Sequence, residues 1–303
     1  MTAILMWGIS IVLALQSLSS PALDGIFLAI TQLGSELFFL VLVPLVYWCI
    51  DKRFGARIAF LFLFSTLANI WLKALFNAPR PYQVDSRVRL VGPAETSPGM
   101  PSGHAQSTTT AWGALGWRAR RGWMWALAVA VVGLVSLSRL YLGVHFPHDV
   151  IGGILFGAIA VAVFLRVEPA VSARLAALPF GAQIVGSLVV PIALLIVVVN
   201  RDSVAATGVL AGLGIGYAIQ RRWVNFAVSG SAARRALRFV LGTIGVLAIY
   251  LGLRAAFGAI AKEEETALWY VLRFVRYGLA GLWAGGLWPM IAVWVGLAAR
   301  DED

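Results

Sequence analysis

Long apolar runs recur along the whole chain, and short polar stretches separate them. A run of roughly 18 or more apolar residues is long enough to cross the hydrocarbon core of a bilayer as a helix. The pattern therefore predicts an all-α, polytopic helical membrane protein. Ten spans are expected, at about residues 3–19, 35–50, 54–76, 103–117, 123–138, 150–166, 180–199, 204–220, 238–260 and 273–297.

The composition agrees with a membrane protein. Of the 303 residues, 60% are hydrophobic and 13% are charged, whereas soluble domains average about 25% charged residues. The net charge of +10 lies mainly in short clusters between the apolar runs, which is typical of topology-setting loops and argues against nucleic-acid binding. The single Cys49 can form neither an internal disulfide nor a cysteine-based metal site, and we interpret it as a small buried hydrophobe.

Lysine and arginine fall unevenly on the two sides of the predicted spans. If the spans alternate in direction, one side receives the clusters at residues 52–57, 118–121 and 234–238. Cation-rich loops face the cytoplasm. We therefore expect both termini in the cytoplasm, as an even number of spans requires, and the opposite face toward the periplasm or exterior.

Three polar motifs are predicted to meet at that opposite face. Lys73–Pro81 ends the third span, Pro101–His104 opens the fourth, and Ser138–Asp149 joins the fifth to the sixth. All three histidines of the chain lie in the last two motifs. Polar, irregular backbone at this depth is tolerated where it lines a cavity, and ionisable groups there are typical of function.

The first two motifs carry groups suited to phosphate. Arg80 offers a planar fork and Lys73 a point charge, although such a pair alone is typical of interfacial anchors. Gly103 allows close backbone approach, Ser102 can donate its hydroxyl, and the free N–H groups of a helix start favour an anion. His104 would protonate a leaving oxygen, but a serine cap beside a hydrogen-bonded histidine explains this motif equally well.

The third motif predicts a nucleophile. His145 and Asp149 are four residues apart, so on a helical turn they share a face. A carboxylate that holds one imidazole nitrogen fixes the tautomer and leaves the other nitrogen free to attack. Arg139 adds another phosphate donor. His148 is expected to face away from Asp149 and to act only as a polar contact. Arg87, Arg89 and Glu95 belong either to a lid over the site or to a solvated loop.

Together these residues resemble the complete signature of the type 2 phosphatidic acid phosphatase superfamily, over roughly residues 20–166. The signature positions are Lys73, Arg80 and Pro81, then Pro101-Ser102-Gly103-His104, then Ser138, Arg139, His145 and Asp149. The resemblance implies a core of six transmembrane helices, here residues 1–170, followed by about four additional spans in residues 171–303. It also implies hydrolysis through a phosphohistidine, with no metal and no cofactor.

The resemblance further implies the role of each residue. His145 would be the nucleophile, Asp149 would orient it, and His104 would protonate the leaving group. The equatorial phosphoryl oxygens would be held by Lys73, Arg80 and Arg139, with Ser102 and the Gly103 N–H assisting.

The expected partners are a lipid phosphate and the membrane. The arginine- and alanine-rich composition suggests a bacterium, and hence its inner membrane and polyprenyl diphosphate as substrate. Phosphatidic acid, phosphatidylglycerol phosphate and a sphingoid-base phosphate remain alternatives. So do a lipid-linked phosphotransferase and a non-enzymatic phospholipid transporter, although binding alone needs no nucleophile.

The additional C-terminal segment carries no second motif. Arg254, Arg273 and Arg276 are explained by snorkelling to the interface more simply than by a second anion site. The small residues from Gly281 to Gly286 can pack closely against another helix or a second subunit, so a homo-oligomer remains open.

Overall fold

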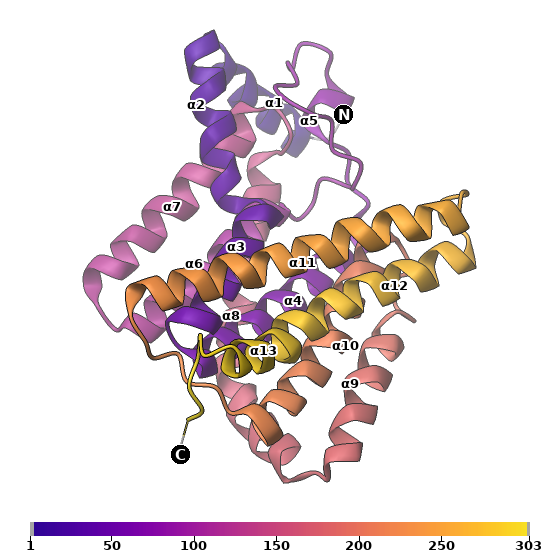
Figure 1. Cartoon of the computed structure of the whole chain (residues 1–303). Coiled ribbons are helices and arrows are strands. Elements are labelled where there is room, and N and C mark those ends of the chain that lie inside the picture. Colours follow the sequence, from indigo (N-terminus) through magenta and orange to yellow (C-terminus); the bar gives the residue numbers. More distant parts are fainter. Residues whose placement is uncertain (1–2, 302–303) are drawn as a thin grey trace. The chain divides into compact units, whose positions relative to one another are not determined.

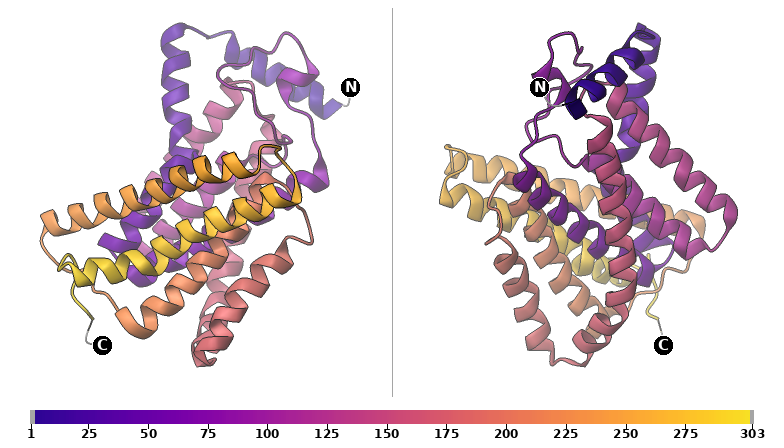
Figure 2. Two further views of the ribbon diagram at one scale, coloured as in Figure 1. Left: turned by 45° about the vertical axis from the view of Figure 1, so that its right-hand side comes forward. Right: turned by 180° about the vertical axis from the view of Figure 1, so that it is seen from behind.

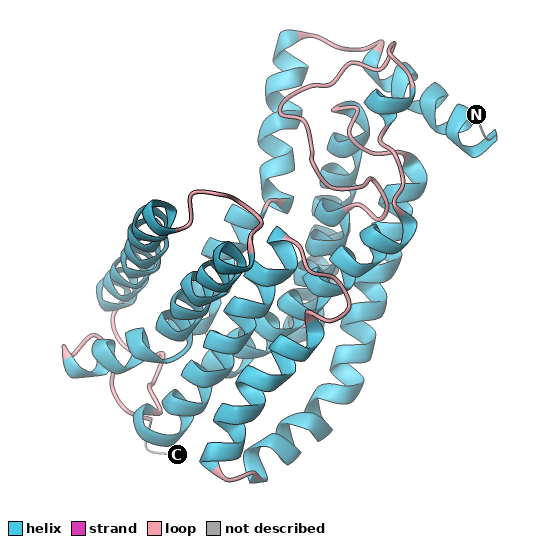
Figure 3. Ribbon diagram, turned by 90° about the vertical axis from the view of Figure 1, so that its right-hand side faces the viewer, coloured by secondary structure: helices cyan, strands magenta, loops and turns pink. Residues whose placement is uncertain are grey.

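The computed structural model describes residues 3–301, and their regular structure is helical, which confirms the all-α class (Figures 1 and 3). The α-helices are α1 (Ala3–Gln16), α2 (Pro21–Thr31), α3 (Glu36–Cys49), α4 (Lys52–Phe76), α5 (Pro81–Val84), α6 (Gly103–Ala119), α7 (Gly122–Tyr141), α8 (Pro147–Ala177), α9 (Phe180–Leu194), α10 (Arg201–Ile219), α11 (Ala232–Ile260), α12 (Ala267–Leu282) and α13 (Trp288–Trp294).

The helices form two compact units. Residues up to 39 and 64–167 make the first unit, and residues 40–63 and 168 onward make the second. Every residue of the three polar motifs falls in the first unit. The assignment of residues 1–170 and 171–303 to separate functional parts stays a prediction.

Five helical segments are long and apolar enough to cross a membrane, and the chain is therefore an integral membrane protein with several helical spans. They are residues Lys52–Val84, Gly122–Tyr141, Pro147–Ala177, Arg201–Val224 and Ala232–Ile260. A sixth span results if Ala3–Gln16 and Pro21–Gly34 are counted as one, although they meet at a bend of 119° (Figure 2).

The prediction of ten spans was therefore wrong, and with it the six-helix core and the four additional spans. Residues 171–303 contribute two candidate spans. Helix α9 has only 15 residues, and a π-helical turn at Trp283–Leu287 separates α12 from α13 in the last apolar run. Hydropathy shows how apolar a run is, but it does not show where the helix within the run ends.

In the first unit, polar side chains join α4 to α6. Asn69 donates from Nδ2 to Gln106 Oε1 at 2.8 Å, and the hydroxyls of Ser65 and Thr110 lie 2.9 Å apart. All four side chains are buried, where hydrogen bonds are costly to leave unmade. These bonds fix the register of α6, whose first turn carries the second motif.

Glycines let α8 approach α6 at the same end. A Cβ atom on Gly153 would lie 2.5 Å from the Ser102 carbonyl oxygen, and one on Gly157 would lie 2.7 Å from that of Gln106. These glycines are four residues apart, so they present one face of α8 without side chains. The first turn of α8 and the first turn of α6 therefore lie side by side.

The second unit has its own core, centred on Trp48, Phe226 and Trp288. Its helices α10 and α12 pack through glycines, as the small-residue segment predicted. A Cβ on Gly286 would lie 2.4 Å from the Gly216 carbonyl oxygen, and one on Gly212 would lie 1.8 Å from that of Gly278. Helices α11 and α12 lie side by side in the views of Figures 1 and 2.

Candidate active site

Ends of helices position the groups of the three motifs. Lys73 lies in the last turn of α4 and Arg80 caps the start of α5. Ser102 caps α6, whose first two residues are Gly103 and His104. Arg139 lies in the last turn of α7, His145 in the following loop, and Asp149 in the first turn of α8.

The structure brings His145, Asp149 and Arg80 into contact. His145 Nδ1 lies 3.4 Å from Asp149 Oδ2, and His145 Nε2 lies 3.3 Å from Arg80 Nη1. His145 is 1% exposed and Asp149 is fully buried. With Nδ1 facing the carboxylate, the tautomer that carries its proton on Nδ1 leaves the Nε2 lone pair directed at the guanidinium side of the site.

Several contacts hold Asp149 in place. Its Oδ2 accepts a hydrogen bond from the Phe146 N–H at 2.9 Å, and its carbonyl oxygen accepts one from the Ser102 N–H at 2.9 Å. His148, expected to face elsewhere, has its Nε2 3.5 Å from Asp149 Oδ1 and its ring stacked on Phe146. The aspartate therefore links the start of α8 to the cap of α6, and His148 is a neighbour of the site.

The cations are held by the loop between α5 and α6. Arg80 is 1% exposed; its Nε donates to the Ser97 carbonyl oxygen at 2.8 Å and its Nη1 to that of Val144 at 2.9 Å. Lys73 Nζ donates to the Pro98 carbonyl oxygen. Backbone carbonyls satisfy these donors without neutralising their charge, so these contacts leave the positive charges of Arg80 and Lys73 in place.

Glu95 is the carboxylate that sits between the cations. It accepts a hydrogen bond from Arg139 Nη2, and its other oxygen lies 3.8 Å from Arg80 Nη2. Arg139 is also fixed by a 2.9 Å bond from Nη1 to Thr31 Oγ1. Burial raises the pKa of Glu95, but Arg139 and Arg80 outweigh it and lower the pKa below the ordinary value of 4.5. Of the two interpretations of this loop, a lid over the site and a solvated loop, the contacts of Glu95 fit the lid.

The second motif forms the start of a helix. Ser102 is fully buried, and its Oγ accepts from the Ala105 N–H at 3.5 Å. A Cβ on Gly103 would lie 3.4 Å from Asn69 Oδ1, an ordinary contact, so no close approach to the protein itself requires this glycine. The serine cap and a phosphate-binding helix start are compatible here, because the cap uses one N–H group and others remain.

The surroundings of His104 and His145 favour the neutral imidazole. Burial, and then the charge of Arg139, lowers the pKa of His104 from 6.5 to about 3. Burial, and then the charges of Arg139 and Arg80, hold the pKa of His145 well below 6.5. A neutral imidazole is the nucleophilic form. Within residues 3–301, no three His, Cys, Asp or Glu side chains gather as metal ligands. The three motifs contribute the cations Lys73, Arg80 and Arg139 to the site.

Comparison with known proteins gives two matches to family models. The PAP2 superfamily matches residues 54–172, and the PAP2 superfamily phosphatase, transmembrane extension, matches residues 204–300. The first match contains all eight candidate residues, from Lys73 to Asp149.

Curated relatives differ in their named substrates. Undecaprenyl-diphosphatase of Sulfolobus acidocaldarius is 30% identical over 137 residues, which cover 45% of this chain and 66% of that protein. Mouse sphingosine-1-phosphate phosphatase 2 is 31% identical over 43% of this chain and 38% of its own length. Human glucose-6-phosphatase 3 is 32% identical over 50% of each. The chain thus spans about half the length of the curated relatives it matches. By its two family matches, which together cover more than half of its residues, the chain belongs to the PAP2 superfamily and carries that superfamily's transmembrane extension.

Proposed function

We propose that this chain is a membrane phosphatase that hydrolyses a lipid phosphate through a phosphohistidine on His145. The observation that carries the proposal is the geometry of that side chain. Nδ1 lies beside the buried Asp149, and Nε2 lies beside Arg80. A role in binding alone would need the cations but not an oriented imidazole.

In the first step, the Nε2 lone pair of His145 forms a bond to phosphorus, and the bond from phosphorus to the lipid oxygen breaks. That oxygen leaves with the bonding electrons and takes a proton from His104. Asp149 stabilises the positive charge that develops on the imidazole of His145. Lys73, Arg80 and Arg139 hold the three equatorial oxygens, because phosphoryl transfer depends mainly on positioning and charge stabilisation.

In the second step, a water molecule gives a proton to His104 and attacks phosphorus. The nitrogen–phosphorus bond breaks, inorganic phosphate leaves, and the lone pair returns to His145. His104 thus acts first as an acid and then as a base.

The role of His104 as an acid requires its pKa to rise when substrate binds. Its pKa of about 3 reflects burial and the repulsion of Arg139, Lys73 and Arg80. A bound phosphate brings negative charge among those cations and offsets the repulsion, which favours the protonated imidazole. Glu95 has to leave the two arginines for the phosphate to reach them.

For the substrate we favour a polyprenyl diphosphate, in agreement with the archaeal undecaprenyl-diphosphatase among the relatives. Phosphatidic acid, phosphatidylglycerol phosphate and a sphingoid-base phosphate are the alternatives, and the mouse relative acts on the last class by name. We place the enzyme in a bacterial inner membrane, with the site toward the periplasm and both termini in the cytoplasm.

The test is phosphate release by the purified full chain, measured with each of these lipids and with glucose 6-phosphate as the soluble control. We expect His145→Ala to lower release from the preferred lipid by at least about a thousandfold, with unchanged membrane insertion and unfolding temperature. Turnover at the wild-type level in that variant would refute the proposal. Activity should also persist in excess EDTA.

The same assay separates the other functions. With a donor labelled in its phosphate, hydrolysis gives free labelled phosphate, whereas a phosphotransferase gives a second labelled lipid on thin-layer analysis. A transporter that only binds phospholipid would release no phosphate, and His145→Ala would leave its transport intact.

A further inference from the structure

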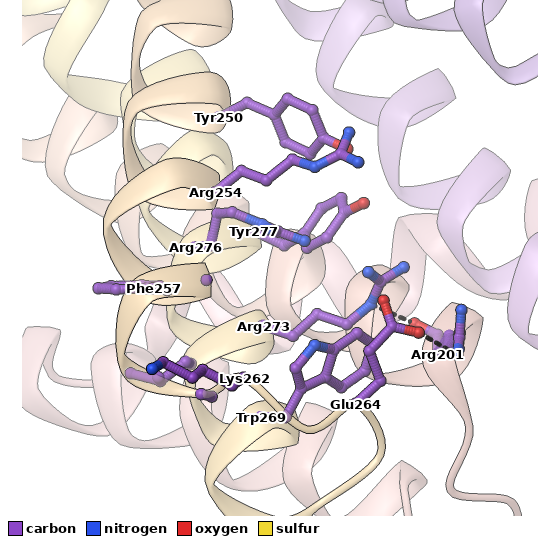
Figure 4. A pocket seen from close by; sticks show the side chains of 13 residues that line it. Arg201, Tyr250, Arg254, Phe257, Lys262, Glu264, Trp269, Arg273, Arg276 and Tyr277 are labelled. Atoms are coloured by element: carbon purple, nitrogen blue, oxygen red, sulfur yellow. Dashed lines mark hydrogen bonds and ion pairs between the residues drawn. The ribbon is translucent and has the colours of Figure 1, made fainter.

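A cavity of about 360 Å³ lies in the second unit, and none of the residues that line it belongs to the three motifs (Figure 4). It is lined by residues from the last turns of α11, from α12 between Trp269 and Tyr277, from the loop that connects these helices and from the start of α10. Five of the lining side chains are cationic: Arg201, Arg254, Lys262, Arg273 and Arg276. The lining contains one carboxylate, Glu264, so the cavity is strongly positive.

The acidic side chains nearby neutralise only one of these cations. Arg201 donates to Glu264 and, at 2.8 Å from Nε, to Glu265. Throughout the described residues, no carboxylate forms an ion pair with any of the other four cations. Arg254 is exposed, and it points toward the cavity that Figure 4 shows.

Arg276 is the most informative of the four. Its side chain is 9% exposed, and its Nε has no hydrogen-bond partner. Its guanidinium lies 5.1 Å from the ring centres of Tyr250 and of Tyr277. These rings stabilise the cation without cancelling its charge. A buried charge without a counter-charge is costly, and snorkelling to the interface does not account for a guanidinium buried in this way.

Arg273 is fixed beside it. Its guanidinium lies 5.0 Å from the ring centres of Trp269 and of Tyr277, and its Nε donates to the Arg201 carbonyl oxygen at 2.8 Å. Of the Arg273 guanidinium nitrogens, only Nε donates a hydrogen bond in these contacts. Nη1 and Nη2 therefore remain available to an anion. Two neighbouring planar guanidinium groups on aromatic rings are suited to the oxygens of a phosphate.

The position of the cavity along the helices indicates where the ligand comes from. Arg201 is the first residue of the candidate span Arg201–Val224, and Arg254 lies near the end of the span Ala232–Ile260. Ends of spans lie at the level of lipid headgroups. Apolar side chains on α11 and α12 that are next in sequence to lining residues are exposed, among them Leu251 at 56%, Ile260 at 62% and Val271 at 58%. A lipid could place its headgroup in the cavity and its chains along these side chains.

We propose that this cavity is a second phosphate-binding site, which takes the anionic phosphate headgroup of a membrane lipid. Arg273 and Arg276 bind the phosphate oxygens, and Arg254 adds charge at the entrance. The site lies outside the group of residues around His145, so it does not depend on the proposed catalytic function.

Hydrogen–deuterium exchange of the purified full chain in detergent tests the proposal, because the protected peptides show where a ligand binds. Three probes are compared: short-chain phosphatidic acid, short-chain phosphatidylcholine and inorganic phosphate. We expect phosphatidic acid to protect residues 250–277, with an apparent affinity at least about tenfold higher than that of the other two. Protection by inorganic phosphate at equal concentration would also support the phosphate site, with free phosphate as its source.

Variants then test the assigned residues. Combined Arg273→Gln and Arg276→Gln should remove the protection, and Arg254→Gln, at an exposed position that is safe for folding, should weaken it several-fold. Arg234→Gln is the matched control, since it makes the same charge change at the opposite end of α11 and should alter nothing. Equal protection by phosphatidylcholine, protection by none of the probes, or unchanged protection in the Arg254→Gln variant would each overturn the proposal.

Discussion

At the scale of single residues, two carboxylates act on the candidate site from different sides. Asp149 fixes the imidazole of His145, and Glu95 pairs with Arg139 and approaches Arg80. We propose both arginines as ligands of the phosphate. Glu95 therefore holds the positions that the phosphoryl oxygens would need, and it competes with any phosphate for the same donors.

This competition predicts the effect of removing the charge of Glu95. Glu95→Gln should tighten inhibition by vanadate roughly threefold to tenfold, because the anion no longer displaces a carboxylate. Inhibition constants measured at pH 7 check this. The exposed Glu263→Gln makes the same change elsewhere and should have no effect. Weaker inhibition in Glu95→Gln would mean that Glu95 helps phosphate to bind.

The histidine of the second motif predicts a pH dependence of stability. The pKa of His104 is about 3 in the folded protein and 6.5 ordinarily. As pH falls below about 6.5, the unfolded chain therefore takes up a proton that the folded chain does not, and stability decreases toward pH 3. Unfolding temperatures between pH 7 and pH 5 should fall less steeply in His104→Gln than in the wild type. Parallel slopes would contradict the lowered pKa.

At the scale of helices, the site depends on how closely α8 approaches α6. Gly153 and Gly157 leave space for the carbonyl oxygens of Ser102 and Gln106. The Ser102 N–H donates a hydrogen bond to the Asp149 carbonyl oxygen. The close approach of the two helices therefore sets the distance between the cap of α6 and the Asp149 carboxylate, which faces His145.

A single methyl group tests that packing. In Gly153→Ala the Cβ would lie 2.5 Å from a backbone oxygen, so the helices must separate, at a cost of about 1–3 kcal/mol. Thermal unfolding and phosphate release should both decline. Gly133→Ala on α7, where nothing lies within 4 Å of the new Cβ, should keep or slightly raise stability. Equal behaviour of the two variants would show that the packing is not tight.

The motif residues could be predicted from the sequence, whereas the number of spans and the contacts of Glu95 could not. The motif residues could be identified because they are ionisable side chains in a largely apolar chain and because they stand at the spacing of a family signature. Hydropathy overestimated the spans because it counted apolar runs whose helices are short, such as the 15-residue α9, and because it joined α12 and α13 across the π-helical turn at Trp283–Leu287. Glu95 remained ambiguous because its loop has no periodicity, and only the three-dimensional contacts link it to Arg139.

At the scale of the whole molecule, the hairpin of α6 and α7 indicates which side of the membrane the site faces. Helix α6 starts at the site and ends at Ala119, and α7 returns over 20 residues to Arg139. Twenty helical residues are long enough to cross the bilayer core. Arg118, Arg120 and Arg121 therefore lie at the end opposite the site, and cation-rich ends face the cytoplasm.

Thiol labelling in intact cells tests this orientation. Against a Cys49→Ala background, a membrane-impermeant reagent should label Ser86→Cys, at an exposed position in the loop between α5 and α6, without permeabilisation. Arg121→Cys should react only after the membrane is opened. The reverse order of labelling would place the site in the cytoplasm.

The central claim is that His145 carries the phosphoryl group during turnover. Rapid quenching with a substrate labelled in its phosphate, followed by digestion under alkaline conditions and mass spectrometry, measures this directly. We expect a transient label on Nε2 of His145 that disappears as free phosphate forms, and no label in His145→Ala. Steady turnover with the label on another residue, or with His145 unlabelled at every time point, would contradict it.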